Sequence, residues 1–481
     1  MSEADLAQGR LARRGLLDAG EIAAAARLLA RVEEEGIETL RLVFPDQHGI
    51  LRGKTLTARA LPGALRSGLN VPSTLLLKDT SHRTVFDIWS GRGDSPMRGA
   101  SDVMLVPRPA TFRVLPWAPH SAWLICDVVE RDGAAIPFAS RTLLQSAIDR
   151  LAERGMEACM GLEVEFHVFA RTDPALEHAG TTMPPRPPGT RATNQGYQFL
   201  TDARYGEIAS LMDDLRRNAE GLGLDLRSLE IEMGPSQIEC TFAPGDPMGQ
   251  ADAMVLFRAM VRETCAARGL LASFMPKPRL DNVFGNGWHI HQSVIENATG
   301  RNLFTPDGAG ELTAEAAGWI AGLLEHAAAS SLLIAPTVNS CKRYQPFQLA
   351  PNRIQWGQDN RGAMIRALLD PEGNAARIEN RAPDTSANPY YAFAAQILAG
   401  LEGIRAGLTP PPPTETPYGA EHAELPGNLG AAIEAFARSK LYRREMGEEV
   451  VEYLVHLKRA EWERYLAAVS EWEQAEYFTL F

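Results

Sequence analysis

Two glutamates lie one residue apart in an otherwise apolar stretch, GLEVEFHVF, at residues 161–169. In an extended strand, residues i and i+2 point to the same face, so Glu163 and Glu165 are expected to project together. Two carboxylates side by side repel each other unless a cation neutralises them. A single pair of this kind is more often a solvated polar face. The rest of the chain therefore decides between solvent and metal.

Three further strand-like segments carry carboxylates or imidazoles. These residues are Glu230, Glu232 and Glu239 in LEIEMGPSQIECTF, His289 and His291 in GWHIHQSV, and Glu379 in AARIENRAPD. Each of them alone is more often structural, as a histidine bonded to backbone or a glutamate in an ion pair. Together, on apolar strands, they predict a divalent metal site. Oxygen ligands with some imidazole suit Mg²⁺ or Mn²⁺ better than Zn²⁺, which usually recruits cysteine.

Basic residues accompany the acidic segments. They are Lys342 and Arg343 in NSCKRYQPFQLAP, Arg361 and Arg366 in DNRGAMIRALL, and Arg377 and Arg381 on either side of Glu379. Guanidinium groups and divalent metals both stabilise charge on a transferring phosphate. The combination predicts phosphoryl transfer. No GxxxxGK[ST] loop and no protein-kinase signature occur, so the phosphate site is not a P-loop.

The elements that must position these residues divide the chain into three parts. Residues 1–36 read as a helical segment, with a helix at 20–35 that ends at Gly36. Residues 37–130 are strand-rich, with a hairpin at 37–56 and strands in DVMLVPRP and SAWLICDVV. In the part from 131 to 481, strands alternate with helices at 141–154, 204–222, 246–268, 311–334, 388–405 and, with breaks, 428–475. Proline-rich stretches at 181–196 and 408–419 are expected to be irregular.

Composition restricts the class of protein. The 481 residues are 45% hydrophobic and 22% charged, with a net charge of −12, which argues against general nucleic-acid binding,. Five scattered cysteines without a CxxC pair favour a reduced compartment over a disulfide framework,. No signal-peptide pattern and no long apolar run is present. We therefore expect a cytoplasmic protein without a membrane partner.

The ordered motifs resemble the glutamine synthetase family from about residue 40 to the C-terminal helices. GLEVEFHVF, EMGPSQIE, and FMPKP followed by GNGWHIHQS resemble its metal strands, while APTVNSCKRYQPFQLAP, DNRGAMIR and ARIENRAPDTSANPYYAF resemble its substrate and phosphate segments. The resemblance implies an α+β fold with an N-terminal β-grasp domain and a large α/β catalytic domain. It also implies stacked homo-oligomeric rings, with a dodecamer favoured, and active sites between subunits.

The resemblance also implies roles for the matching residues. The first metal would be held by Glu165, Glu232 and Glu239, and the second by Glu163, His289 and Glu379. The candidate catalytic residues are Arg343, Arg361, Arg366 and Arg381. Arg343 and Arg381 would bind the glutamate carboxylate beside the loop that contains Gly285, and ATP would lie beside His291, Ser293, Arg361, Arg366 and Arg377. Two to three Mg²⁺ or Mn²⁺ ions and ATP would activate glutamate as γ-glutamyl phosphate, which an amine then attacks.

The sequence departs from the family pattern around the amine. Leu349 occupies the position of a flap glutamate that takes a proton from ammonium in true glutamine synthetases. Phe284 replaces an asparagine over the glutamate site, Trp288 replaces a methionine, and Glu230 stands where a histidine is usual. If Phe284 and Trp288 line the pocket, each adds apolar surface worth about 1.5–3 kcal/mol. The alternative is that both pack in the core and that the flap uses another base.

The resemblance implies an ATP-dependent ligase that acts on the γ-carboxylate of L-glutamate, and these departures predict that its second substrate is an organic primary amine. An apolar or aromatic amine is favoured, because an arylamine is already neutral at pH 7 and needs no general base. A polyamine remains an alternative substrate, since the Glu230 carboxylate could bind its second ammonium group. A true glutamine synthetase that uses ammonia, a non-catalytic relative and a small-molecule kinase are the remaining alternatives.

Overall fold

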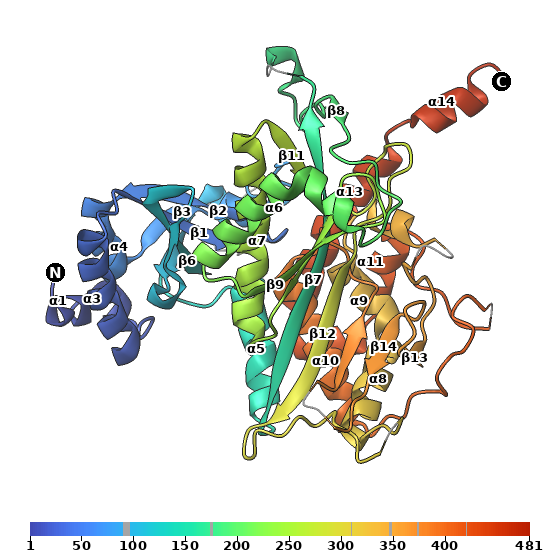
Figure 1. Cartoon of the computed structure of the whole chain (residues 1–481). Helices are drawn as coiled ribbons and strands as arrows, with labels where there is room; N and C mark the ends of the chain where they lie inside the picture. The colour runs from blue at the N-terminus through green and yellow to red at the C-terminus, as the bar shows by residue number, and fades with distance from the viewer. Residues whose placement is uncertain (90–96, 174–176, 309, 346–348, 373–374, 420) are drawn as a thin grey trace.

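The computed structural model describes residues 1–481 except 90–96, 174–176, 309, 346–348, 373–374 and 420. Figure 1 shows a small N-terminal unit of helices and strands beside a larger body through which two long strands run. Helices and strands are both abundant in each part. The α+β fold class predicted from the sequence is confirmed.

Three helices precede the first strand: α1 (Glu3–Ala7), α2 (Arg10–Arg13) and α3 (Ala19–Glu34). The Asp18 side chain accepts from the backbone N–H of Glu21, and the Glu21 side chain accepts from the N–H of Asp18. This reciprocal cap satisfies two backbone donors that the first turn of α3 leaves free. Gly36 follows with a φ of 65°, a conformation that ends helices and favours glycine,. The helix predicted at 20–35 is confirmed.

The N-terminal sheet has the strand order β2-β1-β6-β4-β3, with β5 paired to β6. Its strands are β1 (Thr39–Pro45), β2 (Leu51–Thr57), β3 (Leu69–Pro72), β4 (Asp102–Pro107), β5 (Arg113–Leu115) and β6 (Ala118–Val129), and helix α4 (Leu61–Ser67) joins β2 to β3. β1 pairs antiparallel with β2 and parallel with β6. The predicted hairpin and strands are confirmed, in a mixed sheet of the kind that the β-grasp domain requires. The domain boundaries at residues 36 and 130 stay predictions.

The larger sheet has the order β13-β14-β15-β12-β7-β10-β9, and β8 and β11 also pair with β7. Its strands are β7 (Met156–Arg171), β8 (Thr190–Arg191), β9 (Leu226–Ile231), β10 (Gln237–Phe242), β11 (Leu270–Ser273), β12 (Trp288–Glu296), β13 (Trp356–Gln358), β14 (Ile365–Leu368) and β15 (Arg377–Asn380). β7 is the long central strand, and Figure 1 shows it side by side with β12. Every segment predicted to carry metal ligands therefore belongs to one sheet or its adjoining turns.

Helices pack around this sheet. They are α5 (Ser140–Ala152), α6 (Asp202–Gly221), α7 (Pro247–Ala267), α8 (Ala314–Glu325), α9 (Ala327–Ile334), α10 (Pro389–Arg405), α11 (Leu429–Ala437), α12 (Lys440–Glu445), α13 (Glu448–Leu466) and α14 (Glu471–Tyr477). The predicted helices are confirmed, with one correction. The single helix predicted at 311–334 is two helices that meet at 77°. The proline-rich stretch 408–419 contains no helix or strand, and 181–196 contains only the two-residue β8.

The contact between α8 and α10 depends on glycine. A Cβ on Gly322 would lie 2.1 Å from the carbonyl oxygen of Ala399, so any side chain there would force the helices apart. Close helix packing of this kind buries most of α8 and α10. Among the described helices, none is by itself long and apolar enough to cross a membrane, and only the bent pair α8–α9 meets those criteria jointly.

Candidate active site

Strands β7, β9, β10, β12 and β15, with the turn that follows β9, bring the predicted acidic and imidazole residues to one face of the sheet. The register places Glu239 opposite Glu165 and His289 opposite Glu163. Farther along β12, His291 lies opposite Glu379 of β15. Directly opposite residues on antiparallel strands share a face and lie within side-chain reach. Intervening residues of β7 point the other way and are buried in the core.

Three groups of these side chains, among the residues that the structure describes, bring their ligand atoms within 4.8 Å of one another. They are Glu165, Glu232 and Glu239; Glu163, Glu239 and His289; and Glu163, His291 and Glu379. The first group is the set predicted for the first metal. The second predicted set also comes together, because His289 Nδ1 lies 2.6 Å from Glu163 Oε1 and 3.6 Å from Glu379 Oε1. His291 joins it, with Nε2 3.0 Å from Glu163 Oε2.

Burial and mutual repulsion disturb the pKa values of these crowded carboxylates. Burial, and then the adjacent Glu232, raises the pKa of Glu165 to about 8. Burial and the neighbouring glutamates raise the pKa of Glu239 far above its usual value. Burial also acts to raise the pKa of Glu163, but His289 outweighs it and lowers that pKa. A divalent cation would relieve this repulsion, and the oxygen and imidazole donors fit Mg²⁺ or Mn²⁺.

The raised pKa values predict how the metal-free protein responds to pH. The folded chain keeps protons on Glu165 and Glu239 that the unfolded chain releases above about pH 4.3,. Their contribution to stability is therefore complete below that pH and is lost as pH rises towards 8. We expect the melting temperature of EDTA-treated protein to fall from about pH 5 to about pH 8. Saturating Mn²⁺ should remove most of this fall in differential scanning fluorimetry, and an identical fall with bound metal would contradict the assignment.

Two of the predicted arginines hold Glu379, which is completely buried. Arg366 Nη1 donates to Glu379 Oε2 at 3.0 Å, and Arg381 Nη1 donates to Oε1. Arg343 is 3% exposed and donates to the backbone carbonyls of Arg381 and Ala382. These contacts fix a cationic wall beside the acidic groups, where a carboxylate or phosphoryl oxygen would be stabilised.

Two cavities open onto the acidic groups. A cavity of about 410 Å³ is lined by predicted substrate residues, namely Glu230, Phe284, Gly285, Arg343, Leu349 and Arg381. A second cavity, of about 510 Å³, is lined by all of the predicted ATP residues, namely His291, Ser293, Arg361, Arg366 and Arg377. Both cavities are lined by Glu163, Thr241, Arg361 and Arg366. They therefore meet at the carboxylates, as a phosphoryl transfer between two bound substrates requires.

We call the first of these, the cavity of about 410 Å³, the amine cavity. Trp288 does not line it, so the prediction that Trp288 is a pocket residue is wrong. Trp288 is fully buried and packs against Phe393, with ring centroids 5.4 Å apart. The physical reason is strand alternation: His289 faces the carboxylates, so the residue before it must face the core,. Phe284, by contrast, lines the cavity as predicted.

This difference between two aromatic residues can be measured. Trp288→Phe should reduce the free energy of unfolding by about 1–3 kcal/mol, because it removes buried volume. It should leave the ratio of kcat/KM for an arylamine to that for ammonium unchanged. Phe284→Leu is the matched comparison and should lower that ratio. A selectivity change in Trp288→Phe as large as that in Phe284→Leu would restore Trp288 to the pocket.

The structure adds apolar residues that the sequence interpretation missed. Phe199, Leu200 and Met233 line the same cavity as Phe284 and Leu349, and we call these five residues the apolar rim. Four of them remain large exposed hydrophobics: Phe199 at 49%, Leu200 at 56%, Met233 at 38% and Leu349 at 52%. Apolar surface gathered around a cavity mouth marks a binding site more often than it occurs by chance.

Backbone contacts between distant segments build this rim. Tyr197 N–H donates to the Met233 carbonyl at 2.7 Å, and Leu200 N–H donates to the Ile231 carbonyl at 3.1 Å. The Tyr197 ring also packs edge-on against Phe284, with centroids 5.8 Å apart. For Phe199 and Leu200 the only signal in the sequence was that large apolar side chains follow a proline-rich stretch, in YQFL, without helical or strand periodicity.

Gln237 is a second residue that the sequence interpretation missed. Its Nε2 donates to the Gly285 carbonyl at 2.9 Å and to Asn286 Oδ1 at 3.1 Å. Gly287 N–H in turn donates to Glu165 Oε2 at 2.6 Å. These bonds tie the loop at 284–287 to the first group of carboxylates, so the predicted glutamate loop and metal ligands form one unit.

Comparison with known proteins agrees with this geometry. The model of the glutamine synthetase catalytic domain matches residues 138–477. The chain belongs to the glutamine synthetase family. A γ-glutamylanilide synthase from an Acinetobacter species is 33% identical over 479 residues, which cover 95% of this chain and 96% of that protein. A γ-glutamylethanolamide synthetase, GlnA4 from Streptomyces coelicolor, is 33% identical over 451 residues, covering 93% and 94%.

Solved structures agree with the family assignment. The structure described as apo GmaS without ligand superposes with a TM-score of 0.80 at 29% identity, covering 94% of this chain and 99% of that one. A GmaS complex with ADP superposes with a TM-score of 0.79 at 27% identity, again covering 94% and 99%. As a glutamine synthetase family member, the protein is an ATP-dependent ligase that joins glutamate to an amine, and its family uses divalent metal ions.

Proposed function

We propose that the protein forms γ-glutamyl amides from L-glutamate and an apolar primary amine, with arylamines preferred. The observation that carries this proposal is the apolar rim around the amine cavity. Burial of an aromatic ring against such side chains contributes about 1.5–3 kcal/mol. Ammonium offers no apolar surface, so the rim would contribute nothing to its binding.

Leu349 supports the same choice of amine. Its side chain lies at the cavity mouth, where a family member that uses ammonia would need a carboxylate to hold and deprotonate a cation. A leucine can do neither. An arylamine is uncharged at neutral pH and already has a free nitrogen lone pair, so it needs no carboxylate to bind it as a cation or to remove a proton.

The proposed site residues divide between the two cavities. We assign Glu165, Glu232 and Glu239 to one metal, and Glu163, His289 and Glu379 to the other. Bound Mg²⁺ or Mn²⁺, two to three per site, would neutralise charge on the phosphates of ATP. ATP would occupy the cavity lined by His291, Ser293 and Arg377, and glutamate would lie beside Arg343, Arg381 and Gly285.

Arg361 and Arg366 lie where the two cavities meet, so they would stabilise the phosphoryl group in transit,. An oxygen of the glutamate γ-carboxylate attacks the γ-phosphorus and ADP leaves, which forms γ-glutamyl phosphate. The amine nitrogen, entering past the apolar rim, then attacks the γ-carbonyl carbon. Phosphate departs as the C–N bond forms, and the amine proton passes to solvent.

Glu230 supports a polyamine or ethanolamine as the second candidate class of amine. Its carboxylate lines the amine cavity, and one oxygen accepts from Ser228 Oγ at 2.6 Å. A carboxylate there would suit a second ammonium or a hydroxyl group on the substrate. The exposed apolar rim outweighs this single acidic residue, and we therefore rank the polar amines second.

A phosphate-release assay with ATP, L-glutamate and Mg²⁺ or Mn²⁺ tests the proposal across ammonium, putrescine, ethanolamine, isopropylamine and aniline. We expect the highest kcat/KM with aniline and the lowest with ammonium. Mass spectrometry of the γ-glutamyl amide must account for the phosphate released. Ammonium as the best substrate would overturn the proposed amine class, and phosphate release without amide would overturn the reaction.

We also propose that the protein forms homo-oligomeric rings, with a dodecamer favoured and active sites between subunits. Large apolar side chains of the C-terminal segment support assembly, because Val469, Trp472, Phe478, Leu480 and Phe481 are 63–96% exposed in the single chain,. Figure 1 shows this segment, with α14, projecting from the body. Mass photometry of the purified protein measures the subunit number, and a monomer with full activity would contradict the proposal.

A further inference from the structure

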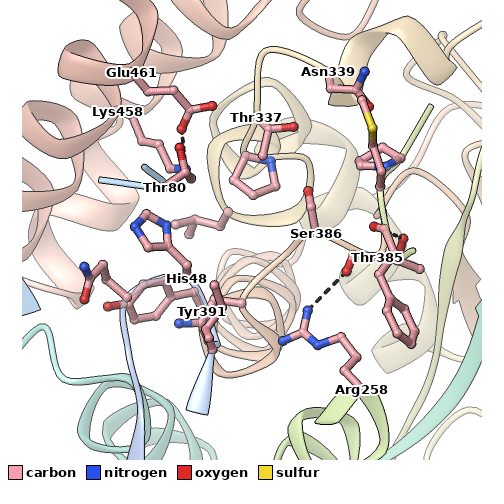
Figure 2. Close-up of a pocket in the computed structure, with 18 of the residues that line it drawn as sticks. His48, Thr80, Arg258, Thr337, Asn339, Thr385, Ser386, Tyr391, Lys458 and Glu461 are labelled. Carbon is pink, nitrogen blue, oxygen red and sulfur yellow. Dashed lines mark hydrogen bonds and ion pairs between the residues drawn. The ribbon is translucent and has the colours of Figure 1, made fainter. Parts of the chain in front are cut away.

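A third cavity, of about 470 Å³, lies between the N-terminal unit and the larger body. Figure 2 shows His48 of the β1–β2 turn on one side, and Arg258, Thr385 and Lys458 of the larger body around it. None of its lining residues lines either of the two active-site cavities. It is therefore a separate space, and the proposed reaction makes no use of it.

Two arginines one helical turn apart on α7 line this cavity. Arg258 is 5% exposed and donates to three backbone carbonyls, those of Gly49 at 2.8 Å, Thr385 at 3.1 Å and Ala387 at 3.0 Å. Arg262 lies with its Cζ 5.2 Å from the centroid of the Phe274 ring. Within the described residues, neither guanidinium has a carboxylate at ion-pair distance.

Arg258 is the buried member of this pair and Arg262 the exposed one. Like charges at i and i+4 repel, and a buried guanidinium without a counter-ion is costly. Burial, and then the charge of Arg262, lowers the pKa of Arg258 to about 9. The backbone carbonyls satisfy hydrogen-bonding capacity but supply no net charge. Asp46 and Asp384 attract Arg258 from beyond ion-pair distance. Asp46 is already paired with Arg52, so the two carboxylates together do not outweigh burial and Arg262. A negative group between the two arginines would restore the balance.

The other walls define what else the occupant must be. Ala272, Phe274, Leu332, Leu333 and Leu454 give the cavity an apolar lining. On the far side, Lys458 Nζ is already 3.2 Å from Glu461 Oε2, and both residues are buried. Glu461 would repel a second negative charge, so a monoanion with an apolar body matches the lining better than a phosphate ester does.

We propose that this cavity binds a small organic carboxylate with an apolar body, its carboxylate held by Arg258 and Arg262. A volume of about 470 Å³ is ample for a phenyl ring with a short acidic chain,. Arg262 lies at the exposed end of the pair and receives the carboxylate from solvent.

The cavity is also placed to influence the active site. Met275 and Pro276 line it, and their carbonyls accept from Asn286, from Nδ2 and from the backbone N–H respectively, both at 2.8 Å. Asn286 lies in the loop at 284–287 that the proposed function assigns to glutamate. A ligand that pushes against Met275 would shift this loop, so the regulatory part of the inference rests on the proposed function. The binding part does not.

Isothermal titration calorimetry of the full-length protein with sodium phenylacetate tests binding without catalysis. Phenylacetamide, which has the same shape but no charge, is the control ligand. Arg262→Gln should weaken phenylacetate binding about tenfold or more, because it removes a charge-assisted contact. Arg262 donates to no backbone group among the described residues, so this variant should fold normally, and its melting temperature checks that it does. Arg343→Gln, in the active site, should bind phenylacetate as the natural protein does.

Each outcome decides the matter. Binding of phenylacetate but not of phenylacetamide, retained in Arg343→Gln and weakened in Arg262→Gln, supports the site. Absence of phenylacetate binding, equal binding of the amide, or loss in Arg343→Gln with none in Arg262→Gln overturns it. In a separate assay with glutamate, ATP and aniline, bound phenylacetate should change the KM for glutamate. An unchanged KM would remove the regulatory role while leaving the binding site standing.

Discussion

Replacing Glu239 with glutamine (E239Q) is expected to lower kcat/KM for amide formation at least about a hundredfold while raising the melting temperature of the metal-free protein at pH 8. Glu239 lies in two of the three groups that could hold a metal ion. Loss of a direct ligand should cost more than the about 10–100-fold typical of residues that only support ligands. Stability should rise because folding at pH 8 forces the buried Glu239 to take up a proton that the unfolded chain has released, whereas glutamine is neutral in both states,.

The opposite directions of these two effects are the test. A merely structural glutamate would lose activity and stability together. Activity is measured by phosphate release at saturating Mn²⁺, and stability by scanning fluorimetry in EDTA. Glu157→Gln is the matched control, since Glu157 is an exposed residue of β7, the strand that pairs with β10, and its replacement should change neither quantity. Wild-type activity in E239Q would exclude Glu239 from the metal site.

Replacing Leu349 with glutamate (L349E) is expected to reverse the preference between amines. Leu349 is half exposed at the mouth of the amine cavity, beside the other residues of the apolar rim. A carboxylate there would remove apolar contact and add a charge that an arylamine cannot neutralise. We expect kcat/KM for aniline to fall about 10–100-fold, from the loss of about 1.5–3 kcal/mol of apolar burial. Activity with ammonium should rise, because the new carboxylate can bind the cation and accept its proton.

Leu349→Gln separates charge from shape. It should lower activity with aniline as L349E does, yet leave ammonium turnover low, because an amide accepts no proton at neutral pH. Competition between aniline and ammonium in one reaction, read by mass spectrometry of the two products, gives the ratio directly. Equal gains in ammonium use by both variants would mean that Leu349 acts through pocket volume alone.

The sequence by itself determined the chemistry of the acidic face. The period-two spacing of strands predicted that Glu163 and Glu165 project from the same face of one strand, and His289 and His291 from the same face of another. The register of β7 and β12 confirms that the two strands share this face. The order of the motifs also predicted the family, which the comparisons confirm. The spacing can be read within a single strand, and the order of the motifs can be read along the chain, so neither requires the folded structure.

The same alternation along a strand also determines where Trp288 lies. If His289 faces the metal ligands, alternation already sends Trp288 into the core, where it packs on Phe393,. The resemblance to a family position suggested a pocket residue, while strand geometry excluded it. The break between α8 and α9 is different, because helical composition continues through the bend and gives no local sign of it.

Only the tertiary structure decided the apolar rim, the meeting of the two cavities and the position of the two arginines at the third cavity. Phe199 and Met233 reach the same cavity through hydrogen bonds between segments that are far apart in the chain. Arg258 similarly meets the carbonyl of Gly49, more than two hundred residues away. Such contacts depend on how loops close over a finished sheet. The sequence therefore determined which groups could bind metal and phosphate, whereas the folded surfaces decided which amine and which further ligand the protein can admit.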